Sequence, residues 1–111
     1  MKDDRAYLLH IRDCVERILE YTRGGRKAFL DDRKTQDAVL RNLEVIGEAV
    51  KGLSDSLKAG QRTIPWKRVA GMRDVLIHHY FGVNLDTVWE VVEEHVPALR
   101  EAVERMLGQE D

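Results

Sequence analysis

The sequence has little of several residue types, and each shortage excludes a class of protein. Of 111 residues only Cys14 is a cysteine, so neither an internal disulfide nor a cysteine-based zinc site can form. There are two prolines, and no run of 18 apolar residues suggests a membrane-spanning helix. The opening residues are charged, and the next apolar ones are interrupted by His10 and Arg12, so we expect no secretory signal. The sequence therefore predicts a cytoplasmic protein without a membrane partner.

Positive charge is not in excess either. The chain has 18 Lys and Arg residues against 20 Asp and Glu, a formal net charge of −2, which argues against an unspecific nucleic-acid coat. The distribution is uneven, because the segment 56–73 contains basic residues and no acid. The basic residues of this segment are Lys58, Arg62, Lys67, Arg68 and Arg73. Two interpretations stay open: a solvated loop, or an RNA-binding surface at Arg62, Lys67 and Arg68.

The sequence does have a repeated amphipathic pattern. Hydrophobic residues make up 43% of the chain, and they recur at spacings of three and four, as in amphipathic helices. The first helix starts near Asp3 and is stopped by Gly24 and Gly25, and Cys14 falls among its apolar positions, so we expect a buried thiol. Its apolar row is Leu8, Ile11, Val15, Ile18 and Thr22. We expect residues 1–111 to form a single domain.

A second, longer helix is expected after a short segment around Phe29 and Leu30. Asp31 or Asp32 is placed to cap it, because an aspartate at this point accepts hydrogen bonds from the free N–H groups of the first turn. Its apolar row is Val39, Leu43, Ile46, Val50, Leu53 and Leu57. Gly47 lies beside this row, and because a glycine inside a helix costs about 1 kcal/mol, we expect another helix to approach closely there.

Two more helices complete the pattern. Residues 58–63 are typical of a loop, and Pro65 suits the first position of a third helix, because its missing N–H is not needed there. The core face of that helix would be Trp66, Val69, Met72 and Leu76, with Phe81 and Gly82 closing it. Asn84 is the expected cap of the fourth helix, in which Pro97 predicts a bend one turn earlier. The expected fold is an all-α, antiparallel four-helix bundle with a short extra helical segment.

The chemically capable side chains are concentrated in GMRDVLIHHYFG, residues 71–82. Arg73 is a permanent cation, His78 can exchange protons near neutral pH, and Tyr80 carries a hydroxyl. On a helix Asp74 lies one turn before His78, so its carboxylate is placed to support the imidazole and favour the protonated form. This combination is typical of general acid–base catalysis assisted by a cation.

One regular helix does not direct the two main groups at the same atom. Arg73 and His78 are five residues apart, roughly 140° around a helix, whereas Arg73 and Tyr80 lie nearly on one line. Either the helix loosens before Gly82, or a second copy of the chain supplies the complementary residue across a two-fold axis. We favour the second arrangement and predict a homodimer.

The spacing of Arg73, His78 and Tyr80 resembles the R-x4-H-x-Y motif of HepT, a HEPN-superfamily RNase of prokaryotic toxin–antitoxin pairs. Residues 37–54 (DAVLRNLEVIGEAVKGLS) and 64–97 (IPWKRVAGMRDVLIHHYFGVNLDTVWEVVEEHVP) are also similar to that family. The resemblance implies a HEPN-like fold, a homodimer with a composite cleft, and cleavage of tRNA or mRNA without a metal or cofactor. Arg73 and His78 would be catalytic, with Asp74 in support. Asparagine is common at the position of Asp74 in this subfamily.

The same resemblance implies how the toxin would be controlled. A minimal nucleotidyltransferase antitoxin, encoded nearby, would transfer AMP to the hydroxyl of Tyr80 and silence the nuclease. A different function also fits the residues. The acidic total and the extra charge of Asp74 favour a non-catalytic helical adaptor that binds a nucleotidyltransferase or a nucleotide, whereas the complete motif favours the enzyme.

Several polar residues keep two interpretations. Arg41 can form ordinary intrahelical ion pairs with Glu44 or Glu48, or Arg41 and Glu48 can line the cleft. His79 is either peripheral or part of the cleft. A metal site built from His78, His79 and His95 is disfavoured, because adjacent histidines point apart on a helix and His95 lies on another.

Overall fold

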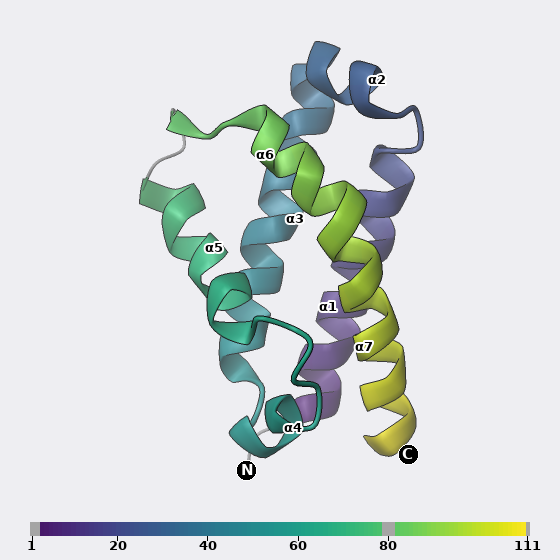
Figure 1. The fold of residues 1–111 in the computed structure, drawn as a ribbon, viewed down its shortest axis with the longest axis vertical. Helices are drawn as coiled ribbons and strands as arrows, with labels where there is room; N and C mark the ends of the chain where they lie inside the picture. The colour runs from purple at the N-terminus through teal and green to yellow at the C-terminus, as the bar shows by residue number, and fades with distance from the viewer. Residues whose placement is uncertain (1–2, 79–81, 111) are drawn as a thin grey trace.

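The computed structural model describes residues 3–78 and 82–110, and the side chains among them except those of residues 75–78, 109 and 110. The described residues form helices and no strand, in the order α1 (Asp4–Tyr21), α2 (Arg26–Asp31), α3 (Arg33–Gly52), α4 (Asp55–Ala59), α5 (Trp66–His78), α6 (Leu85–Glu90), η2 (Val91–His95) and α7 (Val96–Glu110). The long helical segments, called rods below, are α1, α3, α5 and the continuous run of α6, η2 and α7, which is the C-terminal rod (Figure 1). The predicted all-α fold class is confirmed.

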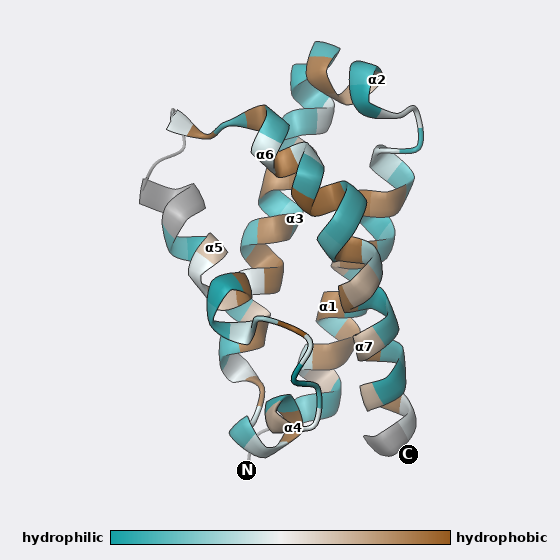
Figure 2. Ribbon diagram, in the orientation of Figure 1, coloured by the Kyte–Doolittle hydropathy of each residue, from teal (hydrophilic) through white to brown (hydrophobic). Residues whose placement is uncertain are grey.

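The rods are held together by their apolar faces. α1 packs against α3 and α7, and α3 also packs against α5. The hydrophobic residues of each rod are interleaved with polar ones at helical spacing, as Figure 2 shows, and 0% of the surface of Leu8, Ile11, Val15 and Ile18 is exposed. The thiol of Cys14 is buried as expected, and burial raises its pKa. None of the described helices is both long and apolar enough to cross a bilayer.

The first residues of α3 and α6 are capped by side chains that the sequence predicted. Asp32 caps α3, accepting a hydrogen bond of 3.1 Å from the backbone nitrogen of Lys34. Asn84 caps α6, accepting from the backbone nitrogens of Asp86 at 2.9 Å and Thr87 at 3.2 Å. Each cap satisfies N–H groups that have no partner inside the helix, which fixes where the helix begins.

The second long helix ends earlier than its apolar row predicts. α3 stops at Gly52, and Leu57 belongs to the separate helix α4. Asp4 accepts hydrogen bonds from the backbone nitrogen of Ser54 at 2.8 Å and from its hydroxyl at 2.7 Å. The hydroxyl of Ser54 in turn caps α4 by accepting from the nitrogen of Leu57 at 3.3 Å. The prediction of a helix that continues to Leu57 was therefore wrong, because a residue 50 positions away interrupts it. The loop predicted at 58–63 begins later, at Gly60, after the end of α4.

The third long helix starts at Trp66, one residue later than predicted, with Pro65 just before it. The indole nitrogen of Trp66 donates to the carbonyl oxygens of Lys58 at 3.0 Å and Gln61 at 3.1 Å, which anchors the start of α5. Its expected core residues Val69 and Met72 are half-buried, since α5 packs mainly on α3. The side chain of Leu76, and Phe81, lie outside the described residues.

The C-terminal rod contains the irregularity predicted from Pro97. The turn directly before it, η2, is π-helical, and α6, η2 and α7 follow one another without a break. The proline ring would clash with the carbonyl of the residue four positions earlier, and it offers no N–H to that carbonyl. Wider π-helical winding relieves the clash without ending the helix. The rod changes direction where α6 passes into α7 (Figure 1).

Candidate active site

Arg73 is placed by a close crossing of α3 and α5. A Cβ atom on Gly47 would lie 3.0 Å from the backbone nitrogen of Arg73 and 3.0 Å from the carbonyl oxygen of Val69. Such distances are shorter than ordinary van der Waals contacts, so a glycine is needed for the two backbones to come this close. The close approach predicted at Gly47 is confirmed, and it brings Arg73 directly onto α3.

The guanidinium of Arg73 takes part in a chain of alternating charges. Its Nε lies 2.5 Å from Oε2 of Glu48, and its Nη1 lies 3.1 Å from Oδ1 of Asp74. The same oxygen of Asp74 is 3.5 Å from Nζ of Lys51. The positive charge of Lys51, together with the hydrogen bonds from Lys51 and Arg73, holds the pKa of Asp74 below its usual value. Asp74 is therefore a carboxylate at neutral pH and balances part of the local positive charge.

Arg73 lines an open groove of about 680 Å³ between α1, α3 and α5. The groove is lined by Tyr7, His10, Arg41, Glu44, Val45, Glu48, Ala49, Lys51, Gly52 and Arg73. Arg41 is paired with Glu44 through an Nη1 to Oε1 contact of 3.2 Å, one of the intrahelical pairs considered from the sequence. Glu48 instead reaches across to Arg73, and both Arg41 and Glu48 lie in the groove. Cations and carboxylates thus share one solvent-accessible surface.

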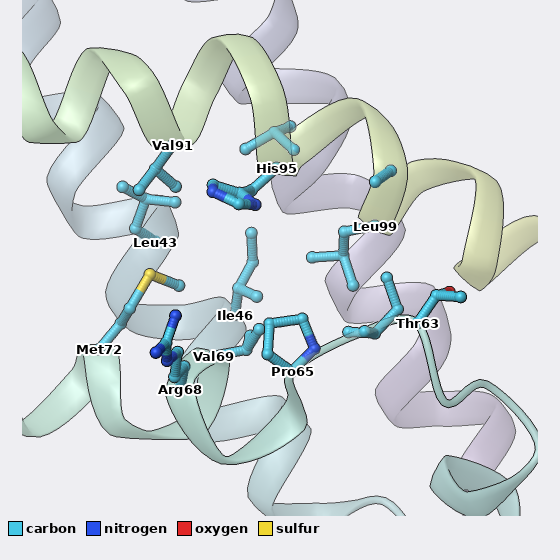
Figure 3. Close-up of a pocket in the computed structure, with 13 residues that line it drawn as sticks. Leu43, Ile46, Thr63, Pro65, Arg68, Val69, Met72, Val91, His95 and Leu99 are labelled. Atoms are coloured by element: carbon cyan, nitrogen blue, oxygen red, sulfur yellow. The ribbon is translucent and has the colours of Figure 1, made fainter.

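Not all of the basic stretch is gathered around Arg73. Arg68 lines a separate, mostly apolar cavity of about 250 Å³ between α3, α5 and the C-terminal rod. Arg68 from α5 and His95 from η2 lie on opposite sides of this space, with Ile46 between them in the view of Figure 3. Arg68 and Arg73 are five residues apart, which directs them to different sides of a helix. Arg62 and Lys67 are exposed and do not line the Arg73 groove.

Part of the predicted motif is not described by the structure. The backbone of His78 is the last described position of α5, but its side chain is outside the described residues, as are His79 and Tyr80. The support of His78 by Asp74 therefore stays a prediction. The carboxylate of Asp74 has the cationic partners Lys51 and Arg73 in the structure.

Among the polar residues that line the groove, Tyr7, His10 and Lys51 were not predicted from the sequence. Tyr7 and His10 come from α1 and lie three residues apart, so they share one face of that helix, beside the buried row of Leu8 and Ile11. The spacing was visible in the sequence. It could not reveal that this face borders Arg73, which is more than sixty positions further along the chain.

Comparison with known protein families shows which family the chain belongs to. The model of the family described as HepT-like ribonuclease matches residues 11–106. The chain belongs to the HepT-like family. This HepT-like chain is 46% identical over 97 residues to a candidate RNase of Methanocaldococcus jannaschii, covering 86% of this chain and 80% of that protein. It is 42% identical over 106 residues to the protein named "Probable ribonuclease HepT" of Thermococcus cleftensis, covering 95% of this chain and 96% of that protein.

Another relative is longer. The HepT-like chain is 42% identical over 111 residues to a Methanocaldococcus jannaschii protein named as a gamma-glutamylcyclotransferase and candidate RNase. The match covers 99% of this chain but spans half of that protein, 50% of its length. No solved structure matches the HepT-like chain significantly.

Proposed function

We propose that this HepT-like chain is a ribonuclease that cleaves RNA without a metal ion, with Arg73 and His78 as its catalytic residues. The observation that carries the proposal is the position of Arg73, the first residue of the R-x4-H-x-Y motif. Its side chain is 37% exposed and is held by Glu48 on the wall of an open groove. The relatives named as RNases support the same activity.

The proposed reaction needs three contributions. One imidazole removes the proton from a 2′-hydroxyl, whose oxygen attacks the adjacent phosphorus. The bond from phosphorus to the 5′-oxygen breaks, and a protonated imidazole gives that oxygen a proton, leaving a 2′,3′-cyclic phosphate and a 5′-hydroxyl. Arg73 lies against the phosphate and neutralises the charge that builds on its oxygens in the transition state. Asp74 supports His78 in this scheme.

We further propose that the active unit is a homodimer. Arg73 and His78 project roughly 140° apart on a regular helix, so the guanidinium of one copy and the imidazole of the other would complete a shared cleft. The groove beside Arg73 is open to solvent in the single chain, which leaves room for a second copy and for RNA.

We also propose that the chain is the toxin of a toxin–antitoxin pair, controlled at Tyr80. A nucleotidyltransferase partner would direct the hydroxyl of Tyr80 to the α-phosphate of ATP, forming a phosphodiester and releasing pyrophosphate. Tyr80 follows Arg73 by seven residues, a spacing that puts two residues on nearly the same side of a regular helix. The added phosphate would occupy the guanidinium that RNA needs.

The activity is tested by incubating RNA with the purified chain in EDTA and identifying the product ends. Wild type is expected to produce 2′,3′-cyclic phosphates, and Arg73→Ala and His78→Ala to lower the rate by roughly a hundredfold or more. Arg100→Ala is the matched control, because Arg100 is an ion-paired arginine on α7 that does not line the groove. Unchanged cleavage in His78→Ala would remove the mechanism.

A second candidate is the non-catalytic adaptor, which one observation favours. Arg73 is flanked by the carboxylates of Glu48 and Asp74, which lower its attraction for a phosphate. An adaptor would bind its nucleotidyltransferase partner with wild-type affinity in both Arg73→Ala and His78→Ala. It would also release no RNA fragment at any enzyme concentration.

A further inference from the structure

Tyr7 is one of two large hydrophobic side chains that are exposed in the described part of the chain, the other being Tyr21. Its ring lies against Gly52 at the end of α3, where a Cβ atom would overlap the far end of the ring. Among the described residues only Gly25 has a positive φ, so the backbone at Gly52 does not itself require glycine. A side chain at this position would instead displace the ring of Tyr7.

The ring and the guanidinium of Arg73 border the same groove. Tyr7 rests on Gly52 and Arg73 is paired with Glu48, and these two α3 positions are four residues apart on one face of the helix. One helical turn, about 6 Å along the axis, therefore separates the two contact points. An exposed aromatic ring and a phosphate-binding cation side by side are the combination that binds unpaired nucleotides.

We propose that Tyr7 is a stacking platform for one unpaired base of the RNA substrate, while a phosphate next to that base contacts Arg73. The proposal rests on the ribonuclease function proposed above and specifies its substrate class as single-stranded RNA. A paired base has both faces covered by its neighbours and cannot reach the ring. The ring supplies affinity and selects unpaired segments, and takes no part in proton transfer.

The test uses a single-stranded 2′-O-methyl oligoribonucleotide that contains the fluorescent base 2-aminopurine. The oligonucleotide cannot be cleaved, because methyl groups block the 2′-hydroxyls that would attack the phosphorus. Wild type should bind it and quench its fluorescence by stacking. Tyr7→Leu should weaken binding roughly tenfold and lose most of the quenching, whereas Tyr7→Phe should keep both. Tyr21→Leu is the matched control: an equally exposed tyrosine of α1 outside the groove.

Gly52→Ala provides a second variant that leaves Tyr7 in place. The new methyl group would displace the ring, so binding and quenching should fall in the direction of Tyr7→Leu. In the double variant, Gly52→Ala should add little to the loss from Tyr7→Leu, because both act on one ring. Thermal unfolding checks that each variant is folded.

The outcomes separate this inference from the ribonuclease proposal. If wild type cleaves RNA and Tyr7→Leu binds and quenches the oligonucleotide like wild type, the stacking role is wrong and the nuclease stands. Equal affinity of wild type for the single strand and for the same strand in a duplex would also overturn it. If wild type neither binds nor cleaves RNA, both proposals fail.

Discussion

Arg73 and Glu48 are joined across the crossing of α5 and α3, with Nε of the guanidinium 2.5 Å from Oε2 of the carboxylate. Their side chains are 37% and 61% exposed, and a pair of this kind contributes only about 0–1 kcal/mol to folding. Its main effect is to set the direction of the guanidinium. With Nε engaged by Glu48, the Nη groups are the ones left for other partners, and Nη1 contacts Asp74.

Glu48→Ala is expected to lower kcat roughly tenfold with little change in KM, because an unguided guanidinium is misplaced in the transition state. Glu48→Gln keeps an acceptor oxygen at the same place and should retain most of the activity. Steady-state kinetics on one RNA substrate would measure both variants. Equal losses in the two would mean that the charge of Glu48 matters and its positioning of Arg73 does not.

Asp74→Asn should bind RNA about two- to fivefold more tightly, because it removes a negative charge next to Arg73 and keeps a hydrogen-bonding side chain of the same shape. The gain should shrink at high salt, where exposed charges are screened. Titration of a 2′-O-methyl oligonucleotide at two salt concentrations checks this. Weaker binding in Asp74→Asn would instead assign the carboxylate a direct role in holding the substrate.

The stability of the chain should depend on the charge of Asp74 in a definite pH window. The positive charge of Lys51 is the largest cause that lowers the pKa of Asp74 in the folded chain, and hydrogen bonds from Lys51 and Arg73 lower it further. The stabilisation is therefore present above the ordinary carboxyl pKa and is lost as the pH falls through the lower folded value. The difference in Tm between wild type and Asp74→Asn should be small, seen at pH 7, and absent in strong acid. A difference that grows in acid would contradict the prediction.

Two helical glycines should respond oppositely to alanine. Gly47→Ala should destabilise the chain by about 1–3 kcal/mol, because its methyl group would meet backbone atoms of α5 that cannot move independently. Gly71→Ala meets nothing within 4 Å and should stabilise the chain by up to about 1 kcal/mol through helix propensity. Urea unfolding of both variants measures the contrast. A stabilising Gly47→Ala would show that the close crossing is not required.

AMP transfer is expected to add one adenylate to the wild-type chain when it is expressed with the nucleotidyltransferase that we propose is encoded beside it, and none to Tyr80→Phe. Tyr80→Phe should keep much of the nuclease activity, since the hydroxyl is proposed as a target of modification and takes no part in proton transfer during RNA cleavage. Intact mass measurement gives the result directly. An adduct on both chains would place the modification on another residue.

Much of the helical framework could be predicted because its signals are local. The caps at Asp32 and Asn84 act on N–H groups within three residues, and the irregularity before Pro97 follows from the shape of the proline ring itself. Gly47 also predicted a close approach, although it could not name the approaching helix. The R-x4-H-x-Y motif can be read from the sequence alone, and it marked Arg73 as a candidate catalytic residue without knowledge of its contacts in the fold.

Tertiary packing decided what surrounds Arg73. Asp4 ends α3 by bonding Ser54, which the apolar row of α3 could not reveal, and the same end of α3 receives the ring of Tyr7. Arg68, close to Arg73 in sequence, faces a different cavity because the two point to different sides of α5. Contacts between residues tens of positions apart depend on how helices cross. The sequence by itself determined the motif and most of the helices, apart from the end of α3, and only the packing of α1 and α5 on α3 created the groove.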